Sequence, residues 1–470
     1  MLNRQDNPAL FRAALNDLNL QGYNLSTVMT SKLSDEQIAK VTNLKIQPSS
    51  MGDSKLIGTK GLEQFKNLEH LSIVGQLYSK YARNFDAIYE KQKVIQNYDI
   101  SSDLAFYQSE YESGQLENQD LEAIYGLENL KSLNLSNQRK ITELDLSSLT
   151  NLENVTLTNA TNLQKLSGLD KIEAIKTDNK GYTFDFSGCT ALKTVENFDE
   201  LVQNMINVKV TEAAPKIYFP TITYASIYRD QAMTENADTL NKIDKNPALR
   251  DIVYWAEIDQ GNVRKNHQTG QMEIATKRCE DIIRTVCKDN PQPDIERVSR
   301  WYRWICDNVE YDNDSFNKGK DKTTTFSDSE REKFKNESRS SFYTLWNHKG
   351  VCTGIRNLFN FGATLMGYTS LPINCKAGEK QKNEQTTIND HAMSMMFVGD
   401  NAYFFDPTWD LGNKVSRYFM LTKQEMEARA HNFSLENSGL VYGTASIQQA
   451  LYEMGCLKTK DLSAEQAKNN

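Results

Sequence analysis

The chain has 470 residues, of which 39% are hydrophobic and 25% charged, and its formal net charge is −8. This length predicts more than one domain, each able to bury a hydrophobic core. The acidic balance argues against nucleic acid or an anionic membrane surface as a partner, because both require a basic face. No apolar run approaches the about 20 residues that cross a membrane. The segment Met1–Tyr23 is too interrupted by charges to be a signal peptide.

The seven cysteines are scattered along the chain and form no C-x-x-C pair. They are Cys189, Cys279, Cys287, Cys306, Cys352, Cys375 and Cys456. This arrangement predicts neither a structural zinc site nor a disulfide framework. We therefore expect no metal and no cofactor. Two alternatives for the compartment remain: a reducing compartment of the cell, or secretion of a protein that does not depend on disulfides.

Apolar residues recur at a fixed spacing in the first half of the chain. One copy has Leu127, Leu130, Leu133, Leu135 and Asn137, the next has Leu149, Leu152, Val155, Leu157 and Asn159, and a weaker one has Leu169, Ile172, Ile175 and Asn179. These copies begin 22 and then 20 residues apart, a period typical of leucine-rich repeats. Each copy predicts one short strand whose leucines join a shared core. Earlier copies begin near Val41 and Phe65.

With the stretches at 33–46 and 61–73, the pattern resembles bacterial internalin-type repeat arrays. That resemblance implies an α/β repeat solenoid that binds a protein partner, as in secreted or cell-surface bacterial proteins. We expect a helical cap over 1–30 and repeats over 31–204, interrupted at about 77–118. Residues 205–290 are expected to form a connector and the start of the next domain.

The next segment begins after Pro291 and Pro293. The spacing of apolar residues predicts a helix over Ile295–Val309, with Asp294 as its N-cap. The polar stretch Asp312–Ser338 is expected to be an exposed loop. A short helix capped by Ser340 or Ser341 should follow and stop at Gly350.

Cys352 opens the next predicted helix, CTGIRNLFNFGATLMG. A thiol in the first turn of a helix lies near the positive end of the helix dipole and near unpaired N–H groups. Both favour the reactive thiolate, and those N–H groups can hold a developing oxyanion.

His391 and Asp406 lie on two stretches that predict a β-hairpin with its turn at Gly399–Asn401. Asp406 could then accept a hydrogen bond from one ring nitrogen of His391, which leaves the other nitrogen facing the thiol. A single cysteine, histidine or aspartate of this kind would be interpreted as a structural residue. The order and spacing of the three together favour a catalytic role instead.

The motifs GVCTGIRNLF (350–359), DHAMSMMFV (390–398) and YFFDPTWD (403–410), after WICDNVEYD (304–312), resemble the transglutaminase-like superfamily. The resemblance implies an α+β papain-like core, expected over 291–440. We expect a C-terminal helix and a polar tail over 441–470. It implies that Cys352 is the nucleophile, His391 the general base and acid, and Asp406 the orienting carboxylate.

Two features depart from that family and concern the substrate pocket. Arg356 stands where a small residue is frequent, and Met393 where an aromatic one is. A side-chain donor to the oxyanion is also needed, and Trp304, Tyr311 and Trp346 remain open as candidates.

Two functions follow from the sequence. The first is an acyl-transfer enzyme that forms a thioester with a protein or peptide amide, with hydrolysis by a peptidase or deamidase favoured over cross-linking. The alternative is a bacterial surface adhesin or interaction protein with a non-catalytic transglutaminase-like domain.

Overall fold

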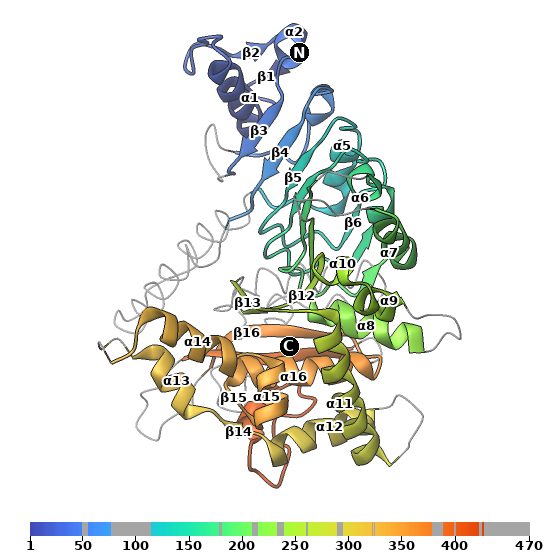
Figure 1. The fold of residues 1–470 in the computed structure, drawn as a ribbon. Helices are drawn as coiled ribbons and strands as arrows, with labels where there is room; N and C mark the ends of the chain where they lie inside the picture. Colours follow the sequence, from blue (N-terminus) through green and yellow to red (C-terminus); the bar gives the residue numbers. More distant parts are fainter. Residues whose placement is uncertain are drawn as a thin grey trace, which may run out of the picture. The chain divides into compact units, whose positions relative to one another are not determined.

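The structure is a computed structural model of the chain (Figure 1). It describes residues 1–48, 55–76, 114–177, 181–208, 215–232, 239–259, 262–288, 295–321, 323, 325–377, 389–398, 401–422 and 425–426. Two compact units are present, Met1–Tyr218 with Lys245–Val253, and Phe219–Asp244 with Tyr254–Asn470. Most of the expected interruption at 77–118 and all of the expected C-terminal helix and tail at 441–470 lie outside the described residues. No helix in the described ranges has the length and apolar character needed to cross a membrane.

The first unit begins with helix α1 (Pro8–Leu20), which lies within the expected N-terminal cap. Pro8 stands at its first turn, where the missing N–H costs nothing. The buried face of α1 includes Leu10, Leu15 and Leu18. The helix packs against β3 (Asn43–Ile46), so its apolar face continues the core of the strands that follow.

Short parallel strands form the body of the first unit. One sheet runs in the order β3, β4 (His70–Ile73), β5 (Ser132–Asn134), β7 (Asn154–Thr156), β9 (Thr183–Asp185) and β11 (Lys216–Pro220, paired over Lys216–Tyr218). A second parallel sheet contains β6 (Glu143–Asp145), β8 (Lys165–Ser167) and β10 (Thr194–Val195). The central apolar residues of neighbouring strands stand side by side, as Leu133 does with Val155. These side chains are buried, so the periodic leucines do form a shared core.

The asparagines at the end of two copies stack on one another. Asn137 and Asn159 both adopt a left-handed backbone, with φ of 61° and 62°. Asn159 Nδ2 donates to Asn137 Oδ1 at 3.1 Å, and Asn137 Nδ2 donates to the carbonyl of Gly75 at 3.2 Å. Asparagine tolerates this backbone better than most residues and supplies the amide that links successive turns.

Helices and single turns connect the strands of the first unit. They are α2 (Asp35–Ile38), α5 (Glu122–Tyr125), α6 (Glu173–Lys176), α7 (Phe198–Ile206) and α10 (Pro247–Arg250), with 3-10 turns at Leu62–Gln64, Asn118–Leu121 and Leu169–Lys171.

The second unit is an α+β arrangement. Before the site come α8 (Thr221–Ala232), α9 (Thr239–Lys245), the antiparallel hairpin of β12 (Val253–Asp259) and β13 (Asn262–His267), α11 (Thr269–Cys287) and α12 (Ile295–Asn308). The site itself is built on β14 (Glu310–Tyr311), α15 (Ser341–Asn347), β15 (Lys349–Gly350), α16 (Cys352–Leu365), β16 (Ser370–Ala377), β17 (Asn389–Val398), β18 (Asn401–Phe405) and the 3-10 turn η5 (Pro407–Asp410). Helix α16 packs on the antiparallel sheet β16-β17-β18, and α12 packs on α16.

The expectation of a helix at Ile295–Val309 is confirmed within one residue by α12. The expectation of a loop over Asp312–Ser338 is wrong, because two helices occupy it, α13 (Asn313–Lys320) and α14 (Asp328–Ser338). Each begins at a capping side chain: Asp312 accepts from Ser315 N at 2.9 Å, and Ser327 forms a reciprocal capping box with Glu330.

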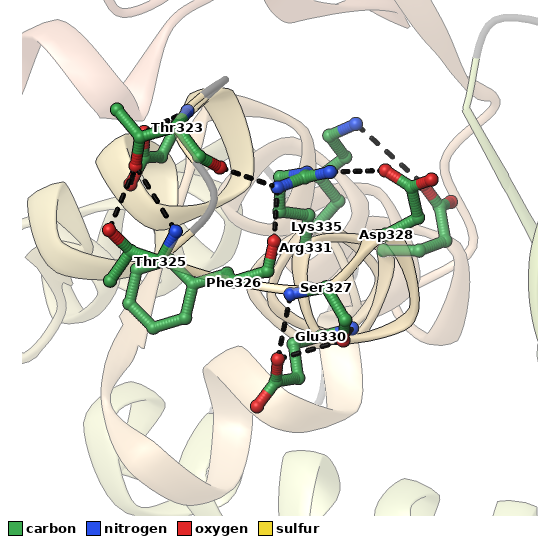
Figure 2. A network of polar contacts seen from close by, with 10 residues as sticks. Thr323, Thr325, Phe326, Ser327, Asp328, Glu330, Arg331 and Lys335 are labelled. Carbon is green, nitrogen blue, oxygen red and sulfur yellow. Dashed lines mark hydrogen bonds and ion pairs between the residues drawn. The ribbon is translucent and has the colours of Figure 1, made fainter.

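The turn between α13 and α14 is held by one arginine (Figure 2). Arg331 donates to the carbonyl oxygens of Thr323 and Phe326 and pairs with Asp328. Helices with almost no apolar face are therefore built from caps, turn contacts and charge pairs, which the hydrophobic pattern does not reveal.

Candidate active site

Cys352 is the first residue of α16. Val351 is the N-cap in extended backbone, and its N–H donates to the carbonyl of Ser338 at 2.9 Å. The preceding strand β15 pairs in parallel with β14, which places Tyr311 opposite Gly350. The thiol therefore projects from a helix start that two other elements hold in place, beside the first-turn N–H groups, for which the helix itself supplies no acceptor.

The hairpin of β17 and β18 brings the predicted histidine and aspartate together. Its register pairs Ser394 with Phe405, and Asp406 follows directly. His391 Nε2 lies 2.7 Å from Asp406 Oδ2. The aspartate side chain is fully buried and that of the histidine is 9% exposed. Because a carboxylate oxygen only accepts, Nε2 carries the proton in this bond, and Nδ1 is the nitrogen left for another partner.

The thiol of Cys352 lies close enough to the imidazole of His391 to act on its pKa, so the structure brings the three predicted residues near one another. Burial alone would lower the pKa of His391, but the charge and hydrogen bond of Asp406, followed by those of Cys352, raise it to about 10. The imidazole is thus a cation at neutral pH. The same attraction stabilises the thiolate of Cys352.

Asp406 is fixed by a buried network that the sequence analysis did not identify. The hydroxyl of Tyr302 lies 2.9 Å from the carbonyl of Asp406 and 2.6 Å from Asp410 Oδ2. Asp410 also accepts the backbone N–H groups of Arg417 and Tyr418 at 3.0 and 2.8 Å. Asp410 closes the DPTWD motif, and Tyr302 lies within the expected helix Ile295–Val309.

Trp409 is a second residue that the sequence analysis did not single out. Its indole nitrogen lies 2.9 Å from His391 Nε2, and the two rings meet edge to face at 5.8 Å. The indole thus lies against the bond between His391 and Asp406. An aromatic cover of this kind keeps water from competing for a charged hydrogen bond.

Of the three candidate oxyanion donors, Tyr311 is the one beside the nucleophile. It lies opposite Gly350, two residues before Cys352, and its phenol responds to the charge of the thiol. Burial, and then the charge of Cys352, raise the pKa of Tyr311, so the phenol keeps its proton. Trp304 stacks on Trp301 at 5.3 Å.

The third candidate and the two departures from the family pattern lie elsewhere. Trp346 is 43% exposed, with the guanidinium of Arg278 over its ring. Arg356 is buried and donates to Asn374 Oδ1 on β16 at 2.6 Å. Met393 is fully buried in β17. Arg356 and Met393 therefore pack within the unit.

The remaining cysteines that the structure describes are buried, and Cys352 alone among them is part-exposed. Burial raises the thiol pKa of Cys279, Cys306 and Cys375 above the ordinary value. Cys456 lies outside the described residues. In the same described ranges no three His, Cys, Asp or Glu side chains gather as a metal site.

No protein-family model matches the chain, and no curated protein matches it. Among solved structures, one described as the crystal structure of a TGase is similar to this chain at 12% sequence identity and a TM-score of 0.25. The similarity covers 37% of this chain and 40% of that one, so the chain spans less than half of the length of that structure.

Proposed function

We propose that the second unit is a cysteine-nucleophile acyl-transfer enzyme that acts on a protein or peptide amide through a thioester. One observation supports this above the others: a single imidazole lies next to the thiol of Cys352, at a helix start, and hydrogen-bonds to the buried carboxylate of Asp406. A thiol, a base and an orienting group in that order are the parts that nucleophilic catalysis needs.

The chemistry follows from the protonation states. The thiolate of Cys352 attacks the carbonyl carbon of the amide and forms a tetrahedral adduct. The imidazolium of His391 gives its Nδ1 proton to the nitrogen of the leaving amine, the C–N bond breaks, and a thioester remains. The neutral imidazole then takes a proton from the acceptor, which attacks the thioester; the C–S bond breaks, and the thiolate of Cys352 and the imidazolium of His391 are restored.

The oxyanion of the adduct needs donors, and two lie at the right place. The backbone N–H of Cys352 is one, and the hydroxyl of Tyr311 is the other, because β14 holds Tyr311 opposite Gly350 and the phenol lies close enough to Cys352 to respond to its charge. A substrate carbonyl entering there would accept from the N–H of Cys352 and from the phenol hydroxyl of Tyr311.

We favour water as the acceptor, which makes the protein a peptidase or deamidase. The experiment is mass spectrometry of a peptide library incubated with the full chain, with and without a lysine-like amine. Peptides shortened at a backbone bond, or heavier by the conversion of Gln to Glu, would establish hydrolysis. Products that carry the amine would establish cross-linking instead.

Cys352→Ala is the matched control for this experiment, because it removes one sulfur and leaves the helix intact. Products that persist in this variant would refute the proposal. A folded wild-type protein whose Cys352 is no more reactive than an ordinary thiol would favour the alternative, an interaction protein with a non-catalytic domain.

We also propose that the first unit is a leucine-rich repeat domain that binds a protein partner. The support is the stack of parallel strands with buried apolar centres, together with the asparagine pair at the turns. The alternate residues of these strands form a row across the sheet, in which the register aligns His70, Ser132, Asn154 and Thr183. A row of polar side chains across stacked strands is the kind of extended surface that repeat arrays offer to protein partners.

A further inference from the structure

A buried acid–base pair stands on the hairpin of β12 and β13, away from the three site residues. Glu257 is 3% exposed and His267 is 2% exposed. His267 Nε2 lies 3.5 Å from Glu257 Oε2, and the imidazole ring packs on Phe342 with centroids 4.1 Å apart. A carboxylate taken out of water costs several kcal/mol unless other groups satisfy it, so its partners reveal its role.

The other oxygen of Glu257 holds the start of α15. Oε1 accepts the backbone N–H of Ser341 at 2.9 Å and also its hydroxyl. Ser340, the N-cap of the same helix, accepts from Phe342 N and Tyr343 N. Burial alone would raise the pKa of Glu257, but the contact with His267 and the serine hydroxyls bring it below the ordinary value. The group is therefore a carboxylate at neutral pH.

Helix α15 in turn lies directly on the backbone around the nucleophile. A Cβ added to Gly354 would stand 2.6 Å from Thr344 Oγ1 and 2.5 Å from the carbonyl of Ser338. A Cβ added to Gly350 would meet the same Thr344 hydroxyl even more closely. Two glycines that flank Cys352 thus let α15 reach the main chain on both sides, so a displacement of α15 displaces the thiol.

We propose that Glu257 and His267 are positioning residues for Cys352: through Ser341 they fix α15, and α15 sets the distance between the thiol and His391. The role rests on the proposed function for its consequence in catalysis, but the contacts are independent of it. Catalysis slows when the reacting groups are displaced even slightly from their productive geometry. Residues that act on Cys352 through α15 can therefore affect the rate without touching the substrate.

The first test is Glu257→Gln in the full chain. The amide keeps the size of the side chain and one acceptor oxygen, but it replaces a charged hydrogen bond with a neutral one, which is about half as strong. We expect amide hydrogen exchange in the peptides that cover α15 and residues 350–354 to speed up about tenfold. Glu280→Gln is the matched control: Glu280 also accepts a hydrogen bond from a part-buried partner, Tyr228 Oη at 3.0 Å, and the substitution should leave these peptides unchanged.

The second readout is the pH profile of iodoacetamide labelling at Cys352. In Glu257→Gln the rise in labelling rate at low pH should shift to a pH about one unit higher, because a displaced thiol loses part of the contact with His391 that stabilises its thiolate. His267→Gln should move it in the same direction. A role limited to stability would lower the melting temperature while the folded molecules kept the wild-type profile, and that result would overturn the proposal.

The two readouts separate this proposal from the proposed function. A wild-type Cys352 that labels like an ordinary thiol would defeat the enzyme, and hydrogen exchange would still decide whether Glu257 fixes α15. If Glu257→Gln does not fold, Ser341→Ala decides, since it loses only the hydroxyl contact. We expect it to change both readouts in the same direction by a smaller amount. Unchanged exchange and an unchanged profile in Ser341→Ala would contradict the proposal.

Discussion

Asp406→Asn isolates the electrostatic part of the site. The amide has nearly the size of the carboxylate, and its Oδ1 can still accept from His391 Nε2, so the change removes a charge and leaves a hydrogen bond. The pKa of His391 is raised from 6.5 to about 10, which corresponds to roughly 5 kcal/mol at 1.36 kcal/mol per unit. Cys352 supplies part of this.

A neighbouring opposite charge accounts for about 1–3 pKa units. We therefore expect the pKa of His391 in Asp406→Asn to fall by that amount. NMR titration of the histidine ring signals measures it directly, because the chain has only 5 histidines and His391→Ala identifies the signal. A fall of less than about half a unit would refute the reasoning.

The same shift makes stability depend on pH. Since the folded protein binds this proton more tightly than the unfolded one, the stabilisation is fully present below pH 6.5 and is lost as pH rises towards about 10. The melting temperature of the second unit should fall across that window in the wild-type protein. It should fall less in Asp406→Asn.

Three further variants test the site and its support. Cys352→Ala should abolish turnover and labelling at this position while the protein still folds, and residual turnover on any substrate would show that another group is the nucleophile. Tyr311→Phe should keep the labelling of Cys352 and lower turnover about 100-fold, the usual cost of one oxyanion donor. Turnover within twofold of wild type would remove Tyr311 from the mechanism. Gly354→Ala should destabilise the second unit by about 1–3 kcal/mol in denaturant unfolding, because its Cβ would meet Ser338 and Thr344. An unchanged unfolding midpoint would show that α15 does not press on this backbone.

The periodic parts of the fold could be predicted from sequence because their signal is local and repeated. Apolar residues 22 apart indicated strands that do stand in register, as Leu133 and Val155 show. The β17–β18 hairpin was expected for a similar reason, since turn residues separate two apolar stretches. Two features of the site could be predicted from this local pattern: the position of Cys352 at a helix start and the proximity of His391 to Asp406.

The supporting contacts could not be predicted, because they join residues far apart in the chain. Glu257 meets Ser341 across 84 positions, and Tyr302 meets Asp410 across 108. Nothing local distinguishes a buried glutamate on a strand from a solvated one. Helices α13 and α14 could not be predicted for another reason. Capping side chains and salt bridges stabilise them, and these interactions leave no hydrophobic periodicity in the sequence.

The central claim is that Cys352 is an activated nucleophile paired with His391. The measurement is the rate of iodoacetamide labelling of each cysteine at pH 6, read by mass spectrometry of the peptides. An unperturbed thiol, with a pKa of about 8.5, is almost wholly protonated there. We expect Cys352 to react at least tenfold faster than the other cysteines in the wild-type protein, and to lose this advantage in His391→Ala. Equal rates for all the cysteines in the folded wild-type protein would contradict the account.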